Sequence, residues 1–270
     1  MGRTTTIEAN VAFHRQLSPR YCEQPFFRPE NQQRVRKLLC DLAEKTGGGR
    51  LLDIGCGTGF ILELAHDVFN ELDGVDITPE MLSLVTPRPN VRVQLALAEE
   101  LPFENNHFDV VTAHSVLHHL ADLFVVFREI RRVLRPGGIF FADESPSQDC
   151  REFLSKLQPL APATEVLSHE LDRLHGDPDR FLERYGIDRE TTRSAMVQNY
   201  EVRGLTEQKL QMQLNDAGFR QVDIRFRRFL GEDEVKRDHG EAAVQHVEQY
   251  LQSILPLSRH LYKFFWLLAG

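Results

Sequence analysis

Between residues 50 and 145 the chain alternates short, largely apolar runs with longer segments whose apolar residues recur every three or four positions. The first pattern is typical of buried strands and the second of amphipathic helices. Strands are predicted at 51–54, 71–76, 91–95, 108–113 and 139–142, and helices at about 59–68, from 78 onward and at about 123–134. Because strands that alternate with helices require right-handed crossovers, the pattern predicts an α/β fold with a parallel, doubly wound sheet.

The segment before the sheet, residues 1–49, is predicted to be helical and to form a lid. Its helices are expected at about 7–17 and 30–45, the second against the edge of the sheet. Between them lies an aromatic, proline-rich piece at 21–29. This piece either packs as ordinary core or folds over a bound ligand.

The segments after the sheet are less regular. We expect residues 50–150 to form the core of the domain, 151–203 to be a helical insertion over the substrate site, and 204–270 to complete the sheet. The elements predicted there are helices at 151–157, 163–174, 178–185, 189–197, 205–215 (capped by Thr206) and 241–254, and strands at 221–229 and 261–268.

A glycine-rich turn follows the first strand. Gly55, Gly57 and Gly59 occupy alternate positions between the apolar run and the next helix. Glycine permits φ > 0 and lets a ligand approach the backbone closely, and the start of the following helix offers free N–H groups. The turn therefore predicts a site for a ligand that carries a carboxylate, a phosphate or a ribose.

Two acidic residues narrow the choice of ligand. Asp76 ends the second strand, where it can accept both hydroxyl hydrogens of a ribose bound over the glycine turn. The spacing is G-x-G-x-G, with Phe60 where the last glycine of a dinucleotide-binding G-x-G-x-x-G turn would stand. Asp53, two residues before Gly55, can receive an ammonium group directly or through water. These features favour a nucleoside that bears an amino acid over a dinucleotide.

The motifs LLDIGCGTG, GVDITPEML, AEELPFENNHFDVV, SVLHHL and RVLRPGG follow in this order over residues 50–145. In combination they resemble the class I S-adenosylmethionine-dependent methyltransferases, and most closely the small-molecule branch that includes quinone and sugar methyltransferases. The resemblance implies a Rossmann-like sheet of seven strands, mostly parallel. The last strand would run antiparallel, between strands five and six.

The resemblance also implies a set of cofactor-binding residues. S-adenosylmethionine would be held at its methionine part by the residues of the glycine turn, at its ribose by Asp76 and at its adenine by apolar side chains. The complete set is Tyr21, Asp53, Gly55, Gly57, Gly59, Asp76, Ile77, Met81, Ala98, Glu99 and His114. Ile77 and Met81 could equally be plain core residues. Leu97 stands where many relatives have an aspartate that binds the adenine amino group, so Glu99 or a main-chain carbonyl would have to replace it.

Transfer of a methyl group to a hydroxyl releases a proton, and a histidine is the usual acceptor near neutral pH. His118 follows strand four and Asp143 ends the neighbouring strand five. The motif pair SVLHHL and FADES is similar to that of sugar O-methyltransferases with a catalytic His–Asp pair, which implies that His118 is the base and Asp143 orients it. The alternative is that His118 and His119 only pack near the site. No metal site is expected, because no carboxylate completes a ligand set with the histidines.

The composition and charge of the chain restrict its expected binding partners and its expected cellular compartment. The chain has 270 residues and a formal net charge of −8, which argues against a general nucleic-acid binder. Its four cysteines are widely spread and form no C-x-x-C pair, which fits a reducing cytoplasm. We expect neither a signal peptide nor a membrane span. The oligomeric state is not predicted.

The sequence thus predicts an enzyme that methylates an oxygen or nitrogen atom of a small molecule in a biosynthetic pathway. Two alternatives remain: a methyltransferase acting on protein or RNA, and a protein that binds S-adenosylmethionine without catalysis. The net negative charge and the absence of an Asn-Pro-Pro-Tyr-like motif after strand four disfavour the protein or RNA methyltransferase. The identity of the acceptor is not predicted.

Overall fold

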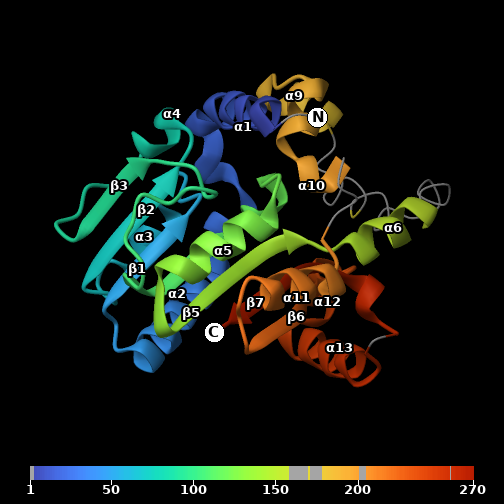
Figure 1. Ribbon diagram of the computed structural model, residues 1–270. Helices are drawn as coiled ribbons and strands as arrows, with labels where there is room; N and C mark the ends of the chain where they lie inside the picture. Colours follow the sequence, from blue (N-terminus) through green and yellow to red (C-terminus); the bar gives the residue numbers. More distant parts are fainter. Residues whose placement is uncertain (1–2, 158–169, 171–177, 201–204, 256) are drawn as a thin grey trace.

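A computed structural model describes residues 3–157, 170, 178–200, 205–255 and 257–270, and shows one mixed sheet (Figure 1). The sheet has seven strands in the order β3-β2-β1-β4-β5-β7-β6. Neighbours from β3 to β5 pair in parallel, whereas β7 runs antiparallel to both β5 and β6. The strands are β1 (Arg50–Ile54), β2 (Glu71–Asp76), β3 (Val91–Leu95), β4 (Phe108–His114), β5 (Leu134–Pro146), β6 (Val222–Phe229) and β7 (Tyr262–Ala269). The predicted fold class is confirmed.

Helices cover both faces of the sheet. The α-helices are α1 (Arg3–Leu17), α2 (Pro29–Thr46), α3 (Phe60–Ala65), α4 (Pro79–Leu82), α5 (Leu123–Val133), α6 (Gln148–Leu157), α8 (Pro178–Tyr185), α9 (Arg189–Ala195), α10 (Val197–Tyr200), α11 (Glu207–Asp216), α12 (Glu232–His239) and α13 (Glu241–Ser253). Short 3-10 helices are η1 (Ser18–Glu23), η2 (Pro25–Phe27), η3 (Leu117–His119) and η5 (Arg259–Leu261).

The two faces of the sheet carry separate apolar cores. On β4, Val110 packs into the core with α2 and α3, and the next residue, Val111, packs into the core with α5 and α11. Phe141 and Phe140 of β5 divide in the same way. Successive side chains of a strand point to opposite faces, so a strand that is covered on both sides is apolar at every position. This explains the continuous apolar runs in the sequence.

The helix predicted at 30–45 is α2, but it does not lie at the sheet edge. Its buried residues Val35, Leu39 and Leu42 join the core on one face of the sheet, together with α3. Gly47 ends it in the left-handed conformation with φ 84°.

Three further segments differ from their predictions. β5 begins at Leu134, so Pro136, Gly137 and Gly138 belong to the strand and not to a turn; its pairing with β4 shifts register between Phe108 and Val110 to accommodate them. The helix α12 was not predicted, because its sequence EDEVKRDH lacks apolar periodicity; acidic residues in its first turn and basic residues in its last favour it instead. The helix predicted at 163–174 lies almost wholly outside the described residues.

The N-terminal helix α1 lies over the ends of the strands. It packs against α9 and α4, two elements far from it in the sequence, at the end of the sheet towards which β1 and β2 point (Figure 1). The buried ring of Phe13 joins Ile187 and Ala195 in a small apolar cluster. In this packing α1 covers the carboxyl ends of the parallel strands.

The side chain of Asp122 caps α5, and its loss should be measurable. Its carboxylate accepts hydrogen bonds from the main-chain N–H groups of Phe124 and Val125 at 3.1 and 3.2 Å. Replacement of an N-cap residue by alanine typically costs about 1 kcal/mol. We expect Asp122→Ala to lower the melting temperature by roughly 2–4 °C and Asp122→Ser to retain most of the stability, both measured by calorimetry. Equal melting temperatures for wild type and Asp122→Ala would contradict the capping role.

Candidate functional site

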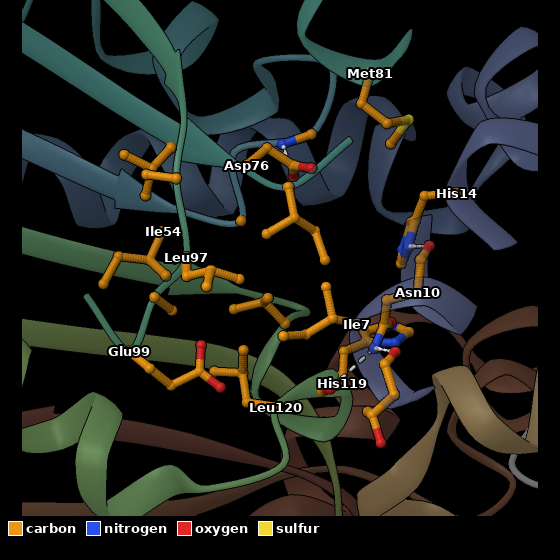
Figure 2. A pocket seen from close by; sticks show the side chains of 18 of the residues that line it. Ile7, Asn10, His14, Ile54, Asp76, Met81, Leu97, Glu99, His119 and Leu120 are labelled. Carbon is orange, nitrogen blue, oxygen red and sulfur yellow. Dashed lines mark hydrogen bonds between the residues drawn. The ribbon is translucent and has the colours of Figure 1, made fainter. Parts of the chain in front are cut away.

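A cavity of about 750 Å³, partly open to solvent, lies between the carboxyl ends of the parallel strands and α1. Its wall includes Gly55 and Gly57 from the glycine turn, Asp76 at the end of β2, and His14 of α1 (Figure 2). This end of the sheet is where open α/β folds bind their ligands.

The glycine turn has the backbone that only glycine adopts readily. Gly55 and Gly57 have φ of 65° and 53°. A Cβ atom on Gly55 would lie 2.5 Å from Cγ2 of Val116, and one on Gly57 would lie 3.3 Å from Cε of Met81. Gly59 has φ of 86° and faces Val85, away from the cavity wall. Two of the three glycines therefore line the cavity, and the third shapes the turn.

The carboxylate of Asp76 bridges two segments beside the cavity. Its Oδ2 accepts from the main-chain N–H of Gly57 at 3.0 Å, and its Oδ1 accepts from that of Thr78 at 2.8 Å. Each oxygen has a further lone pair, because a carboxylate offers about four acceptor positions. Asp76 is thus fixed by the backbone and can still receive two hydroxyl groups.

Asp53 lies beneath the turn and not in the cavity wall. It is 2% exposed, and its Oδ1 accepts from the hydroxyl of Thr112 at 2.7 Å. Burial, with a smaller contribution from the charge of Asp76, raises the pKa of Asp53 to about 8. In this structure Asp53 is therefore mostly protonated at neutral pH.

Other predicted cofactor residues meet at the cavity. Ile77, Met81, Ala98 and Glu99 line it, and so does Leu97 (Figure 2). Together with Ile54 and Val75, the aliphatic members make an apolar slot next to Asp76.

Tyr21 closes the slot from the N-terminal segment. Its ring would lie 3.6 Å from a Cβ on Gly57. Burial and the charges of Asp76 and Asp53 raise the pKa of Tyr21, so the phenol keeps its proton. The aromatic piece therefore does cover the glycine turn.

His114, like Asp53 and Gly59, is a predicted cofactor residue that lies outside the cavity wall. It is 8% exposed, its ring stacks on Phe60 with centroids 5.2 Å apart, and it is absent from the cavity wall. Neither ring nitrogen has a hydrogen-bond partner among the described residues. Burial lowers the pKa of His114 to about 4, with Asp143 opposing the shift. His114 is therefore a neutral, packed side chain behind the site.

The predicted pairing of His118 with Asp143 is not formed. Asp143 is fully buried and accepts from Arg34 at 2.5 Å and from the N–H of Glu144 at 2.8 Å, with Arg227 at 3.6 Å. Burial alone would raise the pKa of Asp143, but Arg34 and Arg227 hold it below its ordinary value.

The partners of His118 differ from the prediction as well. Its ring lies 4.1 Å from that of His119, its Nδ1 has no partner in the described chain, and burial lowers its pKa to about 3. No hydrogen bond or ion pair joins it to Asp143 among the described residues. The physical reason is that Asp143, opposite His114 in the register of β4 and β5, has two closer cations.

The sequence predicted that residues 1–49 form a helical lid, but it did not identify which side chains of α1 line the cavity. Ile7, Asn10 and His14 lie at helical spacing on one face of α1 and line the wall, opposite His119 and Leu120 (Figure 2). Their spacing marks a common face, but nothing in the sequence says which part of the fold that face covers. The side-chain amide of Asn10 donates to the carbonyl oxygen of His119 at 3.2 Å and so ties α1 to η3.

The residues that the structure describes contain no group of three or more His, Cys, Asp or Glu side chains arranged to hold a metal ion. None of their helices is long and apolar enough to cross a membrane.

Comparison with known proteins finds similarity to methyltransferases over β1 to β4 and much of β5. Residues 52–142, about a third of the chain, match a family model described as a methyltransferase domain. The chain is 34% identical over 145 residues to the uncharacterized methyltransferase YcgJ of Bacillus subtilis, covering 50% of this chain and 56% of that protein.

Two relatives have named acceptors. The 27-O-demethylrifamycin SV methyltransferase of Amycolatopsis mediterranei is 36% identical over 119 residues, with coverage of 40% and 43%. The demethylmenaquinone methyltransferase of Staphylococcus aureus is 37% identical over 111 residues, with coverage of 38% and 46%. The chain thus spans about half the length of the curated relatives it matches.

A solved structure shows the same fold over nearly the whole chain. The S-adenosylmethionine-dependent methyltransferase from Mesorhizobium loti superposes with a TM-score of 0.52 at 16% identity, covering 86% of this chain and 95% of that one. At this identity the likeness concerns the fold alone. It agrees with the Rossmann-like arrangement of seven strands.

Proposed function

We propose that this chain transfers a methyl group from S-adenosylmethionine to an oxygen or nitrogen atom of a small-molecule acceptor. The observation that carries the proposal is the carboxylate of Asp76, held by Gly57 N and Thr78 N beside a cavity bounded by the glycine turn. The match of residues 52–142 to methyltransferase domains supports the reaction. The rifamycin and menaquinone enzymes among the relatives support a small-molecule acceptor.

The residues of the cavity fit S-adenosylmethionine in three parts. The carboxylate of Asp76 would accept from the two ribose hydroxyls. Ile77 and Met81 would flank the adenine, with Ala98 and Glu99 along its edge. Leu97 offers only apolar contact where an acid is common; a neutral hydrogen bond of this kind contributes about 0.5–1.5 kcal/mol, so affinity is lowered but binding is retained.

The methionine part would lie over Gly55 and Gly57, where the absence of Cβ atoms allows close approach, with Tyr21 above it. Asp53, beneath the turn, would attract the ammonium group of the ligand through a water molecule or through the negative charge that it gains on losing its proton. Gly59 and His114 would support this part of the site without touching the ligand.

The bound cofactor supplies an electrophilic methyl group on a sulfonium, which is already a good leaving group. The residues of the chain then have to orient two reactants and exclude water, and positioning alone can contribute a large share of the rate. The helix α1 performs the second task, because it covers the mouth of the cavity with Ile7 and Asn10.

A direct assay tests the proposal. The full chain is incubated with S-adenosylmethionine and a panel of small alcohols, phenols and amines, in parallel with peptides and RNA, and S-adenosylhomocysteine and methylated products are measured by mass spectrometry. We expect turnover on the small molecules. Methylation of peptides or RNA only would support the macromolecular alternative, and cofactor binding without any turnover would support a non-catalytic role.

A further inference from the structure

Two imidazole rings from distant parts of the chain meet at the cavity wall. His14 comes from α1 and His119 from η3, and their rings lie edge to face with centroids 4.8 Å apart. Both line the same cavity as Asp76 and the glycine turn (Figure 2). The methyl-transfer site proposed above therefore contains a histidine pair that neither the family match nor any relative assigns.

The hydrogen bonds of both rings fix which nitrogen is basic. Nδ1 of His14 lies 2.9 Å from the carbonyl oxygen of Asn10, and Nδ1 of His119 lies 2.9 Å from that of Ala195. A carbonyl oxygen only accepts, so Nδ1 carries the proton in each ring and Nε2 keeps its lone pair. Among the described residues, neither Nε2 atom has a hydrogen-bond partner. Each ring is thus oriented as a proton acceptor.

The charges around the pair favour His14 as the ring that takes a proton. Burial lowers the pKa of both rings, so both are neutral and able to accept near neutral pH. The carboxylate of Asp76, at the end of β2, partly opposes this shift for His14, whereas His118 and His14 itself lower the pKa of His119 further. Tyr21, from η1, is a further titratable group beside His14, with ring centroids 6.4 Å apart. A charge on His14 would also lower the pKa of His118, from η3.

The position of His14 matches the reacting end of the cofactor. It lines the same cavity as Asp76, which would hold the ribose, and lies beside Tyr21, which covers the glycine turn that would hold the methionine part. The sulfonium joins these two parts of the molecule. His118, by contrast, does not line the cavity.

Resting on the function proposed above, we propose that Nε2 of His14 accepts the proton of a hydroxyl acceptor, with His119 positioning the ring of His14. The acceptor oxygen forms a bond to the methyl carbon as the carbon–sulfur bond breaks, the sulfur leaves as a neutral thioether, and the hydroxyl proton passes to Nε2. The acceptor class is then an alcohol or phenol. A neutral amine needs no such base, because it attacks with a free lone pair.

The first test reads the tautomers and needs no acceptor. Long-range proton–nitrogen correlation spectra of the ¹⁵N-labelled full chain near neutral pH should show His14 and His119 as neutral rings protonated at Nδ1, assigned with His14→Gln and His119→Gln. S-adenosylhomocysteine should shift the Nε2 resonance of His14. A ring of His14 protonated at Nε2, or charged, would overturn the proposal whatever the outcome of cofactor binding.

The second test compares variants in the panel assay. We expect His14→Gln to bind S-adenosylmethionine with unchanged affinity by calorimetry and to lose turnover on hydroxyl acceptors by about 10²- to 10⁴-fold, the usual contribution of a general base. Wild-type turnover should rise as the pH rises through the lowered pKa of His14. The turnover of His14→Gln should not show this rise. His246→Gln, an exposed histidine on α13, is the matched control and should retain turnover.

Two outcomes would count against the pair, and a third concerns only the earlier proposal. Turnover on amines alone would overturn the role of His14. So would a loss of turnover below about tenfold in His14→Gln, with the rise of turnover with pH retained. If the wild-type chain does not bind S-adenosylmethionine, the methyltransferase proposal is overturned. The tautomers of His14 and His119 can still be measured in that case.

Discussion

Replacing Asp76 by alanine is expected to weaken the binding of S-adenosylmethionine by at least about 100-fold. The ligand would lose two hydrogen bonds to a charged acceptor, each contributing about 1.5–3 kcal/mol, and a total of about 3 kcal/mol corresponds to a factor above 100. The change also frees the N–H groups of Gly57 and Thr78, which the carboxylate now holds at 3.0 and 2.8 Å. Titration calorimetry with the full chain measures the affinity directly.

Two further variants separate ligand contact from the shape of the turn. Asp76→Asn keeps one acceptor oxygen for the backbone and should lose less affinity than Asp76→Ala. Asp67→Asn, an exposed residue paired with Arg36, is the matched control and should bind like wild type. An affinity of Asp76→Ala within about threefold of wild type, with a normal melting temperature, would remove the central support for the methyltransferase proposal.

The elements that the sequence predicted well are those whose physics is local. The strands Glu71–Asp76 and Val91–Leu95 have the predicted bounds, because turn residues such as Asn70, Pro79 and Asn90 delimit them. Thr206 caps α11 as predicted, with its hydroxyl accepting from Lys209 N. The cavity residues from Gly55 to Glu99 follow strand ends, and strand ends meet at one edge of a parallel sheet.

The prediction that His118 pairs with Asp143 was wrong, because placing two residues at the same sheet edge does not decide where their side chains point. Ser115 has φ of 55° and Glu144 has φ of 57°, so the chain changes direction directly after His114 and after Asp143. The cation that binds Asp143 most closely, Arg34, comes from α2, and no local pattern relates it to β5.

The particular contacts of α1 could not be predicted for a similar reason, although the segment was expected to form a lid. His14 and His119 are 105 positions apart, and their contact depends on how α1 docks against η3 and α9. Such docking is decided by apolar surface and by a few specific bonds, here the amide of Asn10 to the carbonyl of His119. The amphipathic pattern of a helix says that it packs, but not on what.

Replacing Asp53 by asparagine is expected to stabilise the ligand-free protein by several kcal/mol above about pH 8. The pKa of Asp53 is raised from 3.8 to about 8, mainly by burial. An acid with a raised pKa in the folded state favours folding below its unfolded pKa, and this contribution is lost as the pH rises through the folded pKa. At about 1.4 kcal/mol per pKa unit, a shift of roughly four units gives an upper bound of about 5–6 kcal/mol.

Asparagine is the informative replacement because it keeps the shape of the site. Its side-chain oxygen can still accept from the hydroxyl of Thr112, now 2.7 Å from Oδ1 of Asp53, and it carries no charge at any pH. The two proteins should therefore be equally stable near pH 4 and diverge as the pH rises. Denaturant unfolding at a series of pH values measures the difference. A constant difference across the series would contradict the raised pKa.

The same variant reports on what Asp53 does for the ligand. The carboxylate is 2% exposed and lies outside the cavity wall, so it reaches the ammonium group of S-adenosylmethionine through water or through its charge. We expect Asp53→Asn to weaken the binding of S-adenosylmethionine by about tenfold, less than Asp76→Ala does. Binding to the wild-type chain near pH 7 should release a proton, and the variant should not release it. Calorimetry in buffers of different ionisation enthalpy measures this release. A buried acid that destabilises the free protein and is charged only beside a cationic ligand would explain why an aspartate precedes the glycine turn, where an asparagine would fold more stably.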